Sequence, residues 1–280
     1  MLKHHLSQLL RSVSQVRWIV GWIGLILVMV LWGTTGAIAG PLSDRLERFP
    51  DWQSKPPVQL VQGDLVYPDW MEGTWEVTST LKTQVAPLAP DILTPGFEKN
   101  KRYLEKPISF QVRFAEEQSP GKLLVPMQAQ QGLVSAQKAP VVADREFNGL
   151  NIAKAYLGDR KVLSVKVDPT NPNRQITQLR GDRQLVSIVT ARGSEMPSPD
   201  EFVATEITQQ VFRKEPQIYF NEVETTTEYQ RVQPPLNAIE GNQVTAIYLS
   251  PQDPDYFEAG GKPVALYEYK LELSPVEQEE

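Results

Sequence analysis

Residues 67–81 read YPDWMEGTWEVTSTL, a short aromatic turn that leads into a Gly-Thr-Trp and an alternating segment. One face of the alternation carries Trp75, Val77, Ser79 and Leu81, and the other carries Glu76, Thr78 and Thr80. A period of two is typical of a β-strand with one buried face. The stretch therefore predicts the first long strand of a sheet, which opens directly behind a turn.

The same alternation recurs through most of the remaining chain. ISFQVRF at 108–114 repeats it, and further candidate strands lie at 162–168, 174–179, 184–191, 201–212, 218–232, 244–250 and 264–273. Segments rich in Gly, Pro, Asn and Asp separate them, as turns require. Residues 143–157 fit either a strand or a short helix.

These segments predict an all-β fold with about ten antiparallel strands and long loops. No sustained apolar stripe with a period of 3.6 residues supplies the helices that a parallel sheet needs. Consecutive strands joined by turns form either a sandwich or a barrel, and the two longest candidates favour a barrel whose strands tilt and coil. A sandwich remains the alternative.

The N-terminal segment, residues 1–39, has the parts of a secretory signal. Lys3, Arg11 and Arg17 precede a 15-residue apolar run that ends at Trp32. Ala37 and Ala39 then fit the small-x-small rule for cleavage before Gly40. An uncleaved membrane anchor is the alternative, because about 20 apolar residues span a bilayer.

The rest of the chain divides into three parts. Residues 40–66 contain four prolines and predict a tether, 67–275 form the β-barrel domain, and 276–280 are an acidic tail. We expect export, with only transient membrane contact through the N-terminal segment.

Composition excludes several classes of function. The chain has no Cys, and its two histidines, His4 and His5, both lie in the segment expected to be removed. Catalysis by Ser-His-Asp or Cys-His groups and the usual transition-metal sites are therefore excluded from the mature chain. Without residues 1–39, 25 Lys and Arg face 34 Asp and Glu, a net charge of −9, which argues against nucleic acid as a partner. We expect a non-enzymatic protein without metal or cofactor, in which only carboxylates and tyrosines remain for any acid–base chemistry.

The Gly-x-Trp at the start of the first long strand resembles the opening of lipocalins and the wider calycin superfamily. The resemblance implies a barrel closed at one end by Trp75, with Gly73 letting the backbone pass close to the indole. A basic side chain from a late strand commonly packs across such an indole. Strand parity favours Arg231 for this role over Lys270.

Two longer segments are similar to a group of exported proteins from cyanobacteria and plastids. They are LVYPDWMEGTWEVTSTL at 65–81 and DREFNGLNIAKAYLG at 144–158. The resemblance implies a location in the thylakoid lumen or the periplasm, and it brings no activity with it.

Aromatic side chains recur on the faces expected to point into the barrel. The candidate ligand-lining residues are Phe110, Phe114, Phe202, Tyr219, Tyr229, Tyr248, Tyr267 and Tyr269. Together with Trp75 they line a cavity for a lipid, pigment or quinone, or else they fill the barrel as core. We expect a carrier of a small apolar or amphipathic ligand that serves photosynthetic membranes. The alternative is an assembly module with a filled barrel, which contacts a membrane-protein complex through its loops.

Overall fold

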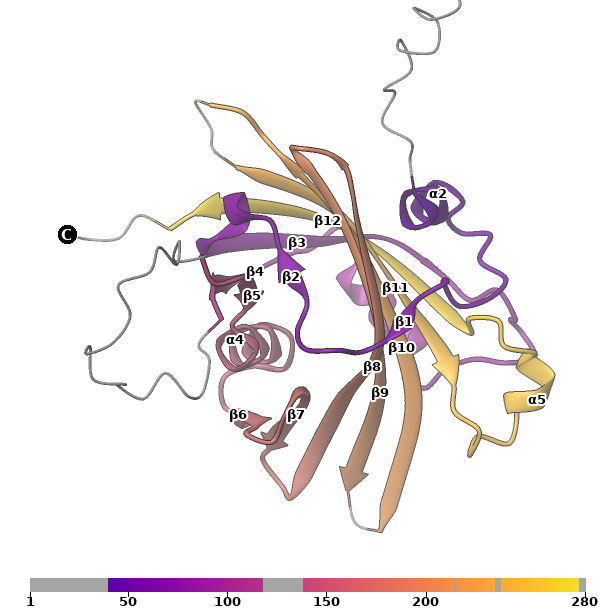
Figure 1. Cartoon of the computed structure of the whole chain (residues 1–280). Coiled ribbons are helices and arrows are strands. Elements are labelled where there is room, and N and C mark those ends of the chain that lie inside the picture. The colour runs from indigo at the N-terminus through magenta and orange to yellow at the C-terminus, as the bar shows by residue number, and fades with distance from the viewer. Residues whose placement is uncertain (1–39, 118–137, 215, 235–237, 277–280) are drawn as a thin grey trace, which may run out of the picture. The chain divides into compact units, whose positions relative to one another are not determined.

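The alternating segments form one antiparallel sheet in the computed structural model, which describes residues 40–117, 138–214, 216–234 and 238–276 (Figure 1). The strands are β1 (Gln59–Leu60), β2 (Val66–Tyr67), β3 (Gly73–Val85), β4 (Pro107–Glu116), β5 (Val141–Ala143), β6 (Val162–Asp168), β7 (Asn171–Leu179), β8 (Arg183–Ser198), β9 (Glu201–Lys214), β10 (Gln217–Arg231), β11 (Ile239–Leu249) and β12 (Ala265–Pro275). Eleven of them follow the order β2-β5-β4-β3-β12-β11-β10-β9-β8-β7-β6, and β1 pairs with β8. The prediction of a mainly antiparallel β fold is confirmed.

The sheet curls into a half-barrel around helix α4 (Arg145–Leu157). The helix contacts β4 near one end of the strand order and β6 and β7 at the other, so it lies inside the curl (Figure 1). The Asp144 side chain accepts a hydrogen bond from the Phe147 amide at 3.1 Å and so caps the start of the helix. Gly158 ends it with a φ of 92°. The segment that fitted either a strand or a helix is therefore a helix.

The turn in front of β3 fixes the indole of Trp75. A 3₁₀ turn, η1 (Asp69–Met71), places the Met71 carbonyl where it accepts a hydrogen bond from Trp75 Nε1 at 2.8 Å. Both side chains are buried in a core on the concave face of the sheet. This core also contains Val77, Val112, Phe114, Phe202, Ile239, Leu271 and Leu273. The aromatic turn therefore anchors the first long strand to the core.

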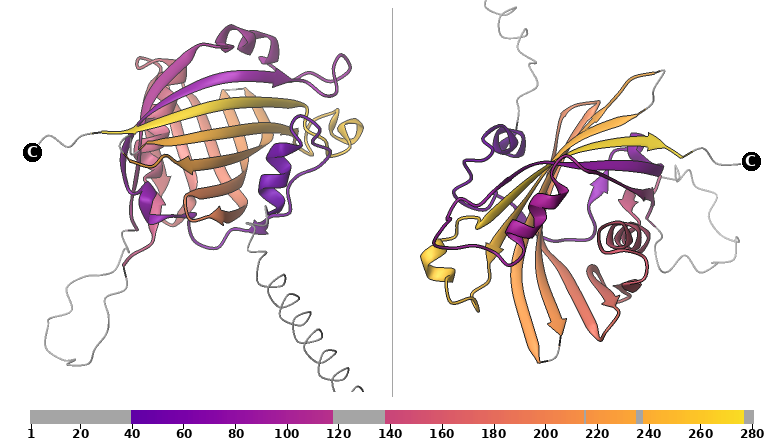
Figure 2. Two further views of the ribbon diagram at one scale, coloured as in Figure 1. Left: turned by 90° about the horizontal axis from the view of Figure 1, so that it is seen from above. Right: turned by 180° about the vertical axis from the view of Figure 1, so that it is seen from behind.

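A second core lies on the outer face of the sheet. Helix α2 (Pro41–Glu47) covers it there, opposite to α4, as Figure 2 shows. Leu42, Leu46 and Trp52 pack against outward residues of β9, β11 and β12. The beginning of the segment expected to be a tether is thus part of the folded structure, because its apolar side chains cover the outer face.

An ion pair inside this outer core joins α2 to β10. Arg45 donates to both carboxylate oxygens of Glu224, through Nε at 2.7 Å and Nη2 at 2.8 Å. Tyr248 and Thr226 also donate to Glu224, at 2.8 and 2.9 Å. Glu224 is 0% exposed, although alternation with Glu222 and Glu228 is a pattern typical of a solvent-facing strand surface. The guanidinium of Arg45 also lies 3.8 Å from the centre of the Trp52 ring.

Three further short helices lie in the connections that the structure describes. They are α3 (Phe97–Asn100), η2 (Lys101–Tyr103) and α5 (Tyr256–Ala259). Phe97 packs with Leu81 and Tyr267, and Ala259 packs with Ile92 and Leu249. These connections cover one end of the sheet.

Candidate functional site

A cavity of about 580 Å³ lies between α4 and the concave face of β7, β8, β9 and β10. The helix contributes Ile152, Ala153 and Tyr156 to its wall, and the sheet contributes Gln175, Val189, Thr208 and Phe212. Small-molecule sites in proteins occupy roughly 300–1,000 Å³. The cavity is therefore large enough for a small organic ligand.

Apolar side chains that reach solvent gather around this cavity. Ile152 is 38% exposed, Leu157 42% and Phe212 38%, and all three line the wall. Single exposed apolar residues are ordinary, whereas several around one concavity form a candidate binding surface. The apolar part of a ligand would replace water here.

The remaining wall is polar but mostly uncharged. Gln175, Gln210, Ser187 and Thr208 place amides and hydroxyls beside the apolar residues. Such groups orient a ligand by hydrogen bonding without requiring a charged partner.

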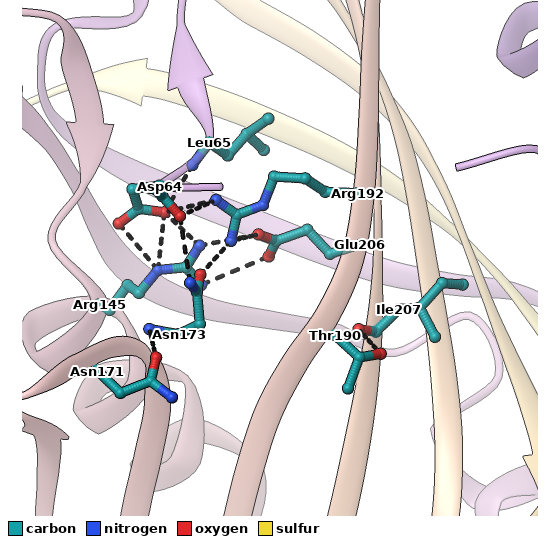
Figure 3. A network of polar contacts seen from close by, with 10 residues as sticks. Asp64, Leu65, Arg145, Asn171, Asn173, Thr190, Arg192, Glu206 and Ile207 are labelled. Carbon is teal, nitrogen blue, oxygen red and sulfur yellow. Dashed lines mark hydrogen bonds and ion pairs between the residues drawn. The ribbon is translucent and has the colours of Figure 1, made fainter. Parts of the chain in front are cut away.

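At one end of the cavity, Arg145 joins the start of α4 to two carboxylates (Figure 3). Its Nε lies 3.0 and 3.1 Å from the two oxygens of Asp64, and Nη2 also donates to Asp64. Nη2 further donates to Glu206 Oε1 at 2.8 Å. Asp64 belongs to the connection from β1 to β2, and Glu206 belongs to β9. Arg145 therefore ties the helix both to this connection and to the sheet.

A second arginine completes the network. Arg192 on β8 contacts Glu206 through Nη2 at 3.0 Å and donates from Nη1 to the Gly63 carbonyl at 2.7 Å. Asn173 on β7 accepts from Arg192 and donates to the same carbonyl at 3.2 Å. Two guanidiniums and two carboxylates meet in one place, so the network as a whole is neutral. It fixes the geometry of the cavity and does not present a free charge to a ligand.

Burial and charge act in opposite directions on the two arginines. Burial alone lowers the pKa of Arg145, but the charges of Glu206 and Asp64 and the hydrogen bonds to them outweigh burial and raise it. Burial also lowers the pKa of Arg192, and here Glu206 only partly opposes it. Arg145 is thus the cation that the two carboxylates hold most strongly.

Tyr67 lies between this network and the concave core. Its ring centre is 4.6 Å from that of Phe114 and 5.5 Å from that of Phe202. Burial first, and then the neighbouring Tyr229 and Glu206, raise the pKa of its phenol well above the usual value. The phenol therefore stays neutral and separates the charged groups from the apolar core.

A β-bulge at Thr190 turns Arg192 toward the network. Val189 pairs with Thr208 and Ala191 with Ile207, so Thr190 is the extra residue between them. The Thr190 hydroxyl donates to the Ile207 carbonyl at 3.2 Å, as Figure 3 shows. Because the bulge shifts the alternation by one residue, Val189 and Arg192 face the same side.

Gly149 allows α4 to approach the sheet. A Cβ atom at this position would lie 2.7 Å from Nε2 of Gln175, which is closer than real Cβ contacts. Any side chain here would have to displace the Gln175 amide from the cavity wall. The glycine thus sets the spacing between the helix and the polar part of the wall.

Tyr156 separates the cavity from a smaller one of about 110 Å³, because it lines both. Its hydroxyl lies 3.2 Å from the Ser79 hydroxyl, and burial raises the pKa of its phenol. Tyr103 and Tyr269 line the smaller cavity.

The outer face carries a groove of a different character. Its volume is about 470 Å³, and its lining includes Lys82, Glu240, Glu268 and Lys270. Lys270 pairs with Glu272 at 2.9 Å, and both side chains are more than half exposed. Such solvated ion pairs are typical of a protein surface, so the cavity under α4 is the stronger candidate.

Of the predicted barrel-closing residues, Gly73 lies beside Trp75 but Arg231 does not. Gly73 has a φ of 133°, and a Cβ built on it would lie 3.9 Å from Trp75 Nε1, so the backbone does pass close to the indole. Arg231 instead contacts Asp200 at 3.9 Å and is largely exposed. In the described part of the chain, the cation–π contacts involve Trp52, Tyr103, Phe147 and Tyr248, and not Trp75. The expected pairing of Arg231 with Trp75 is therefore wrong.

The eight predicted ligand-lining residues lie in several different places. Phe114 and Phe202 are buried in the concave core, with Phe110, Tyr229 and Tyr269 packed against it. Tyr267 packs with Phe97 at the end of the sheet, and the Tyr219 ring lies 6.1 Å from that of Phe212. Tyr269 lines the smaller cavity, and none of the eight lines the larger one.

Tyr248 lies on the outer face, where it bonds to Glu224 and Arg45, so its predicted inward orientation is wrong. Burial and then Glu224 raise the pKa of its phenol. Its partners come from β10 and from α2, the second of which lies in the segment expected to be a tether.

Some predictions concern residues outside the described part. Ala37 and Ala39 of the expected cleavage site lie there, whereas Gly40 is described.

Over the described ranges no helix has both the length and the apolar character needed to cross a bilayer. In the same ranges, no group of three or more His, Cys, Asp or Glu side chains is arranged to hold a metal ion.

Sequence reasoning missed the four charged residues of the network. Asp64, Arg145, Arg192 and Glu206 come from four segments, and no local motif connects them. Asp144, directly before Arg145, was a usable signal for the start of a helix, because Asp is a preferred N-cap residue. The bulge at Thr190, which brings Arg192 to the correct face, leaves no mark in the alternation.

Most of the chain matches the model of a known family. The model of a domain of unknown function, DUF6816, matches residues 59–277. The chain belongs to the DUF6816 family. The DUF6816 match includes all twelve strands, the cavity under α4 and the charged network, but not α2. No curated protein and no solved structure matches this DUF6816 chain.

Proposed function

We propose that this protein binds a small apolar or amphipathic ligand in the cavity under α4. The observation that carries the proposal is the gathering of Ile152, Leu157 and Phe212 around one cavity of about 580 Å³. An apolar chain or ring system would cover these side chains. The amides of Gln175 and Gln210 would meet a polar group of the same ligand. Lipids, pigments and quinones combine both characters.

The neutral network favours a ligand that carries no strong charge at that end. Arg145 and Arg192 are already bonded to Asp64 and Glu206. An anionic ligand would have to compete with these carboxylates, whereas an uncharged polar group would not.

A calycin-like architecture fits this proposal. The half-barrel holds its candidate site on the concave face, as a calycin barrel does, with α4 covering the opening. We also propose, from the sequence alone, that the protein is exported to a thylakoid lumen or periplasm and handles its ligand near a photosynthetic membrane.

Blocking the cavity tests the proposal. Ala153→Trp should weaken binding of the uncharged probes methyl cis-parinarate and decylubiquinone at least tenfold, because Ala153 lines the cavity and an indole would occupy it. Binding to a chain of residues 40–280 is measured by fluorescence and by calorimetry.

Ala155→Trp on the same helix is the matched control, since Ala155 does not line the cavity. It should bind both probes as the parent chain does. Equal binding by the two variants, or no binding by the parent chain, would contradict a ligand site under α4.

A partner-docking role is the second candidate. It is favoured by Leu60 and Phe257, which are 81% and 88% exposed on β1 and α5. Leu60→Ser and Phe257→Ser would release a bound partner in size-exclusion chromatography if these side chains form the contact. They should leave binding of both probes unchanged.

A further inference from the structure

The carboxylate of Glu195, on the outer face of β8, lies in space beside the first described residues, at the start of α2. It accepts hydrogen bonds from the Ser43 amide and the Ser43 hydroxyl, both at 2.7 Å, and from the Leu42 amide at 3.2 Å. Three donors therefore hold this carboxylate in one position, although Glu195 and α2 are about 150 residues apart in sequence.

Gly40 lies directly against this carboxylate. A Cβ atom built on Gly40 would be 2.0 Å from Glu195 Oε2 and 2.9 Å from Oε1. The backbone nitrogen and the Cβ position of one residue are about 2.5 Å apart, so the Gly40 nitrogen lies within about 4.5 Å of Oε2. Only glycine fits here without moving a carboxylate that three hydrogen bonds restrain.

The sequence predicts proteolytic cleavage directly before Gly40. Ala37-Ile38-Ala39 satisfies the small-x-small rule, and cleavage would fall between Ala39 and Gly40. Hydrolysis of that peptide bond consumes one water, leaves a carboxylate on Ala39 and creates an amine on Gly40. The amine is protonated at neutral pH, since an α-amino group has a pKa of about 7.7–8.0.

We propose that Glu195 receives the N-terminal ammonium group of Gly40 once residues 1–39 have been removed. Before cleavage, the Gly40 nitrogen is an uncharged amide. After cleavage it is a cation within reach of an anion that is already held in place. Processing therefore adds an ion pair that fastens α2 to β8, next to the anchor that Arg45 forms with Glu224.

The packing around this contact supports a fixed position for α2. Gly193, two residues before Glu195, faces Leu42 and Val58, whose atoms lie 3.8 and 3.4 Å from a Cβ built on it. These are ordinary van der Waals distances, so α2 and the chain that follows it pack closely over β8 at this point. The first residues of the mature chain are thus held at a defined place.

The test compares two forms of residues 40–280, one with a free Gly40 amine and one with an acetylated Gly40. The free form should melt about 2–4 °C higher, the shift that corresponds to roughly 1 kcal/mol in a domain of this size. In the Glu195→Gln background the difference should vanish, because Gln keeps an acceptor oxygen but loses the charge. Glu98→Gln, which alters an exposed carboxylate elsewhere, should leave the difference intact.

Two further measurements test the contact between Gly40 and Glu195. Gly40→Ala with a free amine should melt several degrees lower than the parent, because its methyl group meets Oε2. The intact mass of the protein from its own cells should correspond to a chain that begins at Gly40. Equal melting of the free and acetylated forms, a difference that persists in Glu195→Gln, or a mature chain that begins elsewhere would each overturn it.

Discussion

Replacing Arg45 with Ala should lower the free energy of unfolding by about 3–5 kcal/mol, because Glu224 would remain charged and buried without its partner. Glu224 is 0% exposed, and Arg45 donates to both of its oxygens. The substitution also removes the cation over the Trp52 ring. Urea denaturation followed by circular dichroism measures the change.

Two comparison variants separate the ion pair from other causes. Lys101→Ala removes a surface pair with Glu98 in which both side chains are more than half exposed, and it should cost less than about 1 kcal/mol. Arg45→Met combined with Glu224→Leu should recover part of the loss, because no unpaired charge remains. A double variant that is less stable than Arg45→Ala would contradict the role assigned to the buried charge.

Replacing Arg145 with Ala should cost about 2–4 kcal/mol, somewhat less than Arg45→Ala, because Arg192 still contacts both carboxylates. The Asp64 and Glu206 side chains are 10% and 20% exposed, so their charges are poorly solvated. The start of α4 would also lose one of its connections to the sheet. Hydrogen exchange should therefore become faster in residues 148–157, and the probes should bind more weakly.

Arg113→Ala is the matched control for this effect. Arg113 pairs with Asp144, the residue next to Arg145, but its side chain is 44% exposed. Its loss should cost about 1 kcal/mol or less and should leave exchange in α4 nearly unchanged. If both variants loosened α4 equally, the network would not be what positions the helix.

Alternation predicted the strands well where one face of the sheet meets a core. In β3, Trp75, Val77, Ser79 and Leu81 are buried, as the period of two required. The alternation did not predict that the sheet stays an open half-barrel with α4 inside it. The α4 segment was ambiguous, because its sequence also suits a strand. Its cap at Asp144 is a local signal, but the place where the helix packs is a tertiary property.

The candidate site and the buried ion pair of the outer core were harder to predict, each for a physical reason. At Thr190 a bulge shifts the alternation, so the parity of Arg192 cannot be counted from the start of β8. On β10, the alternation of Glu224 with Glu222 and Glu228 predicts a solvent-facing position, yet Glu224 is buried against Arg45 from a distant segment. Both depend on contacts between residues far apart in the chain, which one sequence does not reveal.

The aromatic residues illustrate the same limit. Phe114 and Phe202 lie on the concave face as expected, yet they fill the core beside Tyr67. The cavity lies further along the curl, where α4 faces smaller and more polar side chains. Sequence periodicity can assign a residue to a face, but it does not tell which part of that face is filled.

The most direct test of a ligand under α4 is native mass spectrometry of the protein purified from its own cells, before and after solvent extraction. We expect one reproducible additional mass of a small molecule, which disappears on extraction and is missing when Ala153→Trp is purified in the same way. A clean mass of the chain alone, with the protein recovered in a stable complex with another protein, would contradict the ligand-binding function and favour the partner-docking role.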